Sequence, residues 1–172
     1  MKHLLLAALV LVAACGAPIE SPASPTPSTD PSAPVSPTPT LDPRPARSAE
    51  LEAAATRWTD AAYAAYSFTL ERRCFCLPAS QGPWTVTVIV GEASVVDATG
   101  EAPDPSFVDG VPLTIDALFA FLRMQLDADD FTVSYDPVTG APLEVAIDPS
   151  FMMADEETGF LVRDLAPLSI DQ

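Results

Sequence analysis

The chain has 172 residues and a formal net charge of −16, with eight basic side chains against 24 acidic ones. Its only lysine and histidine are Lys2 and His3, so the rest of the chain offers no imidazole or amine for catalysis or zinc binding. Seven arginines scattered among these acids do not form the basic patch that nucleic acid requires. The composition argues against the common nucleophilic enzymes, histidine-ligated metal sites and nucleic-acid binding.

The N-terminus has the features of a secretory signal. A short basic start precedes the apolar run Leu4–Ala14, which is too short to span a bilayer. The run leads into Leu11-Val12-Ala13-Ala14-Cys15, which resembles the lipobox of bacterial lipoproteins. This resemblance implies that residues 1–14 are a signal peptide and that Cys15 is lipidated. Such an anchor would hold the chain on the cell membrane or outer membrane, with its domain in the extracytoplasmic space. An ordinary signal peptide cut nearby is the alternative.

A proline-rich segment follows the lipobox. Ten prolines lie between Pro18 and Pro45, among serine, threonine and alanine. Because such a composition buries too little apolar surface to offset its ordering entropy, it favours an extended, solvated tether. We therefore predict that residues 15–47 are the lipidated cysteine and its tether. Residues 48–172 are then long enough for a single globular domain with one core.

The domain is expected to open with a helix. Ser48 is a good N-cap, and the acids Glu50 and Glu52 suit the first helical turn. Apolar residues recur at helical spacing, with Trp58 as the one large side chain, which we expect in the core. The stripe consists of Leu51, Ala54, Ala55, Trp58, Ala62 and Ala65.

Three strands are predicted next. In the segment 66–76 the apolar residues alternate, and the parity places Cys74 and Cys76 on the same face as Tyr66, with Arg73 on the other. Two further strands, 84–90 and 93–98, flank a turn at Gly91-Glu92 whose register is ambiguous. The proline- and glycine-containing segment 100–112 is expected to be a loop.

A second helix and three more strands complete the pattern. The helix starts at Thr114 as N-cap, strands cover 131–135 and 143–147 around a turn at 136–140, and a last strand covers 160–165. The helix carries an apolar stripe of Ile115, Leu118, Phe119, Leu122 and Leu126. We predict an α+β fold with a mainly antiparallel sheet of five to six strands, two helices on one face and helix-then-three-strands twice.

The motifs resemble an uncharacterised family of bacterial secreted and lipid-anchored proteins that contain a domain of unknown function. The resemblance covers most of residues 48–165 and implies the fold and the compartment, with no activity. The chain departs from the family pattern in the turn within residues 89–94, which we expect to be longer than a compact Asp-Gly turn. The motifs are Trp58, Tyr66 and Phe68, Cys74 and Cys76, Val86 and Val88, Thr114 to Phe119, and Tyr135 to Pro142.

Cys74 and Cys76 are the sharpest chemical feature. Once Cys15 is lipidated these two thiols remain, and an oxidising compartment favours a disulfide between them. Residues i and i+2 of an extended strand lie roughly 6.5 Å apart, so a bridge needs a bend before Leu77-Pro78. A structural disulfide is the simplest interpretation. A strained bridge for thiol exchange and a Cu(I) site with Met124 or Met152-Met153 are the alternatives.

Acidic clusters offer a second candidate site. They contain no calcium-loop motif, no spacing places two carboxylates around a cleft, and charge runs are usually solvated turns. The clusters are Asp148 with Asp155, Glu156 and Glu157, and Asp127 with Asp129 and Asp130. We predict no catalytic residue, no bound metal and no cofactor.

Function is less constrained by the sequence than compartment is. We expect a non-enzymatic lipoprotein that binds an envelope protein or small ligand. One alternative is a thiol-redox or Cu(I)-handling lipoprotein that uses Cys74 and Cys76. The other is an inhibitor or accessory subunit of a secreted hydrolase, which rests on fold-level analogy.

Overall fold

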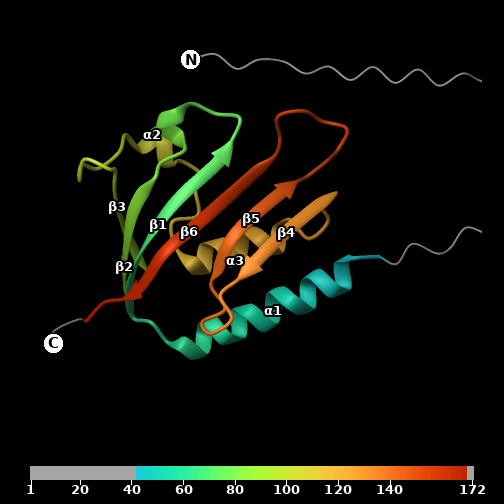
Figure 1. Ribbon diagram of the computed structural model, residues 1–172, viewed down its shortest axis with the longest axis horizontal. Coiled ribbons are helices and arrows are strands. Elements are labelled where there is room, and N and C mark those ends of the chain that lie inside the picture. The colour runs from blue at the N-terminus through green and yellow to red at the C-terminus, as the bar shows by residue number, and fades with distance from the viewer. Residues whose placement is uncertain (1–41, 170–172) are drawn as a thin grey trace, which may run out of the picture. The chain divides into compact units, whose positions relative to one another are not determined.

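The computed structural model describes residues 42–169, which form a six-stranded sheet with helices on one face (Figure 1). The strand order is β3-β2-β1-β6-β5-β4, and every neighbouring pair is antiparallel. This confirms the predicted α+β fold and its repeated helix-then-three-strands order. The elements are α1 (Arg44–Ala61), β1 (Ala65–Cys74), the 3-10 helix η1 (Pro78–Ser80), β2 (Trp84–Ile89), β3 (Glu92–Val96), α2 (Pro105–Val108), α3 (Ile115–Met124), β4 (Asp130–Tyr135), β5 (Pro142–Asp148) and β6 (Thr158–Pro167).

Helix α1 starts at Arg44, so the prediction that it begins at Ser48 is wrong by about one turn. Two features of the sequence explain the earlier start. Pro45 suits the first helical positions, and an Asp42 carboxylate oxygen accepts a 3.0 Å hydrogen bond from the Arg44 backbone N–H. Arg47 donates a 2.7 Å hydrogen bond to the Ala128 carbonyl, which ties this first turn to the folded domain.

The core lies between the inner face of the sheet and the two long helices. Tyr66, Phe68 and Leu70 of β1 are buried, as their alternation predicts, and Trp58 of α1 is buried with them. Burying such side chains stabilises the domain by roughly 1.5–3 kcal/mol each. No helix among residues 42–169 is long and apolar enough to cross a membrane.

The β2–β3 hairpin differs from the prediction. Ile89 pairs with Glu92, so the turn consists of Val90 and Gly91, not of Gly91 and Glu92. It is a compact two-residue turn, which also corrects the expectation of a longer one. Both turn residues have positive φ, as right-handed strand twist favours in such a turn, and glycine adopts this conformation without strain.

The segment 100–112 contains a short helix where a loop was expected. An Asp104 carboxylate oxygen accepts a 2.9 Å hydrogen bond from the Ser106 N–H and begins α2 at Pro105. The cap of α3 was predicted correctly, because the Thr114 hydroxyl accepts a 3.0 Å hydrogen bond from the Ala117 N–H.

Candidate functional site

Two loops project from the same end of the sheet. Strands β1 and β5 end where β6 begins, so the β1–β2 loop and the β5–β6 loop leave the sheet together (Figure 1). The pairing of Cys74 with Thr158 in the last register position of β1 and β6 fixes this arrangement. Segments about 75 residues apart in the sequence therefore frame one end of the molecule.

These loops expose five large apolar side chains, which we call the loop-end rim: Phe75, Leu77, Phe151, Met152 and Met153. Phe75 is 82% exposed and Met152 is 91% exposed. Apolar side chains gathered on adjacent loops mark an interaction surface more often than scattered ones do. Val138, in the β4–β5 turn at the other end of the sheet, is equally exposed at 82% and provides a comparison residue.

Cys74 and Cys76 are joined by a disulfide at the base of this rim, with their Cα atoms 5.3 Å apart. The backbone bends here, as the short span requires. Gln81 adds a second restraint, because its side-chain amide nitrogen donates 3.3 Å hydrogen bonds to the carbonyls of both cysteines. The disulfide and Gln81 together hold Phe75 in place at the rim.

We expect the double change Cys74→Ser and Cys76→Ser to lower the free energy of unfolding by about 1–2 kcal/mol, because the disulfide closes a very short loop. Gln81 still restrains this loop in the variant. Urea unfolding of the variant, the parent and the reduced parent measures the effect. A loss above about 4 kcal/mol would contradict the assignment of the disulfide as a local clip.

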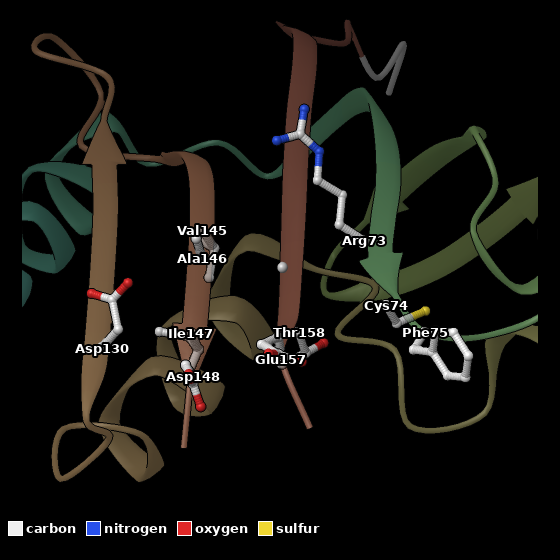
Figure 2. A pocket seen from close by; sticks show the side chains of 11 residues that line it. Arg73, Cys74, Phe75, Asp130, Val145, Ala146, Ile147, Asp148, Glu157 and Thr158 are labelled. Atoms are coloured by element: carbon white, nitrogen blue, oxygen red, sulfur yellow. The ribbon is translucent and has the colours of Figure 1, made fainter. Parts of the chain in front are cut away.

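A shallow depression of about 320 Å³ lies beside the rim on the sheet (Figure 2). Figure 2 shows the Arg73 side chain crossing β6, where its guanidinium forms a 2.8 Å ion pair with Glu144 of β5. Gly159 of β6 pairs with Arg73 of β1 on one side and with Ala146 of β5 on the other. A Cβ at Gly159 would lie 2.5 Å from the Val145 carbonyl oxygen, so this position requires glycine.

Acidic side chains order the β5–β6 loop by accepting hydrogen bonds from its backbone. An Asp129 carboxylate oxygen accepts a 2.9 Å hydrogen bond from the Phe151 N–H, and Asp148 accepts one of 3.0 Å from the Ser150 N–H. Asp130 and Asp148 are direct cross-strand partners beside the depression. Within residues 42–169, no three Asp, Glu, Cys or His side chains are grouped so that they could hold a metal ion.

The structure does not bring all of the residues predicted as sites together in one place. Cys15 lies outside the described residues, Met124 lies exposed on α3, and Met152-Met153 belong to the rim. The sulfurs of Cys74 and Cys76 are bonded to each other, so neither is a free thiolate for Cu(I). Sequence reasoning missed the rim. Two features of the sequence could have indicated the rim. Phe75 alternates onto the face of the strand opposite the buried one, and Phe151, Met152 and Met153 are three consecutive large apolar residues in an acidic segment.

The profile of a protein family described as "Family of unknown function (DUF6174)" matches residues 50–167. The match confirms an uncharacterised domain over almost the span that the motifs indicated, and it carries neither an activity nor a lipid anchor. No curated protein and no solved structure matches the chain.

Proposed function

Because the chain belongs to the family of unknown function DUF6174, we propose from its own geometry that it is a lipid-anchored extracytoplasmic protein that binds a protein partner through the loop-end rim. The exposure of five large apolar side chains at one end of the sheet carries this proposal. Methionines adapt their shape to a partner, and aromatic residues supply rigid contact area, so this composition suits protein binding. The acidic residues around the rim favour a partner with basic groups at its edge.

Membrane anchoring rests on the sequence of the N-terminus. The lipobox resemblance at Cys15 and the proline-rich segment after it support a domain that is held at a distance from the membrane. A non-enzymatic role is supported by the chemistry of the depression. Its cation, Arg73, is already paired with Glu144, and its acids are the cross-strand pair Asp130 and Asp148 at the ends of β4 and β5, with Glu157.

A secreted hydrolase is one partner class that fits this geometry, since protruding apolar loops can enter an enzyme cleft. Thiol exchange is the second candidate function, favoured by the position of the disulfide directly at the rim. A redox titration separates the two candidates. A potential below about −300 mV identifies a structural bridge, whereas a potential near −200 mV identifies an exchangeable one.

The rim proposal is tested by placing a photo-crosslinking amino acid at single positions in living cells. We expect substitution at Phe75 or Met152 to give one adduct of defined mass, and substitution at the equally exposed Val138 to give none. Cell fractionation of the Cys15→Ala variant tests the anchor separately, because an unlipidated chain should leave the membrane fraction.

Adducts of the same mass from all three positions would show that the rim has no special role. A Cys15→Ala variant that is processed and retained like the parent would refute the anchor while leaving the rim proposal intact. If Phe75→Ser combined with Met152→Ser leaves crosslinking from Met153 unchanged, the contact does not depend on apolar burial.

A further inference from the structure

Strand β4 is an open edge of the sheet. It pairs with β5, and within residues 42–169 no other segment forms backbone hydrogen bonds with residues 130–135. The strand contains no proline and no lysine, and its one register irregularity lies at its end, between Ser134 and Tyr135. Natural proteins usually protect an edge of this kind, because its free N–H and C=O groups pair readily with another extended chain.

A groove of about 210 Å³ at this edge is lined by residues of β4 and α1. The β4 side of the groove presents Phe131, Val133 and Tyr135, and all three are only half-buried. The α1 side contributes Arg47 and Glu50. The other edge strand, β3, differs because Glu92, Ala93 and Ser94 are exposed, and its half-buried apolar residues are confined to its end at Val95 and Val96.

Two polar groups that line the groove, the Tyr135 hydroxyl and the Glu50 carboxylate, have no partner among residues 42–169. The Tyr135 hydroxyl oxygen is buried without a hydrogen-bond partner among the described residues, and its burial raises the pKa of Tyr135 to about 12. Glu50 forms no hydrogen bond or ion pair within residues 42–169. One guanidinium nitrogen of Arg47 donates to Ala128, and the group lies 5.5 Å from the centre of the Phe131 ring. The exposed Glu50 carboxylate is therefore the group of the groove that is free to meet a ligand.

We propose that the groove between α1 and β4 binds an extended peptide segment of another protein, which adds to the sheet as a seventh strand. Main-chain hydrogen bonds to β4 would provide the affinity, and alternate apolar side chains would pack on Phe131, Val133 and Tyr135. Charge complementarity selects a basic segment, because Glu50 is unpaired and the chain carries a net charge of −16. This surface is separate from the rim and goes beyond the proposed function.

The test uses a capped heptapeptide that alternates valine with threonine or lysine, and two versions N-methylated on alternate amides. A strand at an edge bonds through one of its two sides, so one N-methylated version should bind like the parent peptide and the other should not. Hydrogen exchange of the full chain locates the site. At a peptide concentration about ten times Kd, exchange in residues 130–135 should slow about tenfold, with residues 92–96 unchanged.

Variants complete the experiment. Glu50→Gln should weaken binding of the lysine-containing peptide about two- to fivefold, and the matched change Glu92→Gln on β3 should not. Phe75→Ser should bind the peptide like the parent, which separates this groove from the rim. Equal binding of both N-methylated peptides, protection of residues 92–96 in place of 130–135, or no binding at millimolar peptide would overturn the proposal.

Discussion

Replacing Gly140 with valine should lower the free energy of unfolding by about 4 kcal/mol, through backbone strain and overpacking together. Gly140 lies in the turn between β4 and β5 with φ of +79°, a conformation that side chains with a branched Cβ rarely adopt. A Cβ there would also collide with the Ala54 carbonyl oxygen of α1 and lie 2.9 Å from the Arg57 Cβ. The carbonyl belongs to a helix backbone, so it cannot move aside without displacing α1.

Gly100 provides the matched control for this prediction. It has nearly the same backbone conformation, with φ of +85°, but nothing lies within 4 Å of the position that its Cβ would occupy. Gly100→Val should therefore show the conformational cost alone, about 1–2 kcal/mol. Urea unfolding of both variants measures the difference. Equal losses would show that the contact between α1 and the β4–β5 turn is not what requires a glycine.

The Gly140 contact also bears on the proposed peptide site. It brings α1 against the β4–β5 turn, and α1 supplies the Arg47 and Glu50 wall of the groove. Any variant that displaces α1 should therefore also change the groove. For this reason the peptide experiment relies on Glu50→Gln, which changes an exposed side chain and leaves the helix packing untouched.

Local periodicity was enough to predict most elements of the fold. The period-two alternation of apolar residues predicts that Tyr66, Phe68 and Leu70 of β1 are buried. A hydroxyl residue followed by an apolar stripe predicts that α3 begins directly after its cap, Thr114. The misplaced start of α1 has a different origin. Pro45 reads as part of a proline-rich tether by composition, yet proline in a first helical turn is compatible with a helix.

The rim could not be predicted from the sequence because it depends on a long-range strand pairing. Phe75 and Met152 occur in separate halves of the chain, and the adjacency of their loops follows from β1 pairing with β6. Periodicity reports which face of a strand is buried but not which strands are neighbours. The same reasoning applies to the peptide groove, because β4 is an edge strand only through the sheet order.

The second large effect is expected at Trp58, which anchors α1 to the sheet. Its side chain is 6% exposed, and its ring meets Tyr63 and Tyr66 edge-on at centroid distances of 5.5 and 5.1 Å. Tyr66 in turn accepts a 3.2 Å hydrogen bond from the Ile115 N–H at the start of α3 through its hydroxyl oxygen. Trp58 thus supports a chain of contacts that joins α1, β1 and α3.

Trp58→Ala should cost about 3–5 kcal/mol of unfolding free energy, the usual range for removing a large aromatic side chain from a core. Trp58→Phe keeps an aromatic ring against Tyr66, so it should cost only about 1–2 kcal/mol. Urea unfolding measures both variants, with the fluorescence of the buried Trp84 as a probe that survives the change. A loss below about 1 kcal/mol for Trp58→Ala would mean that α1 is held by Leu51 and Ala54 without its aromatic anchor.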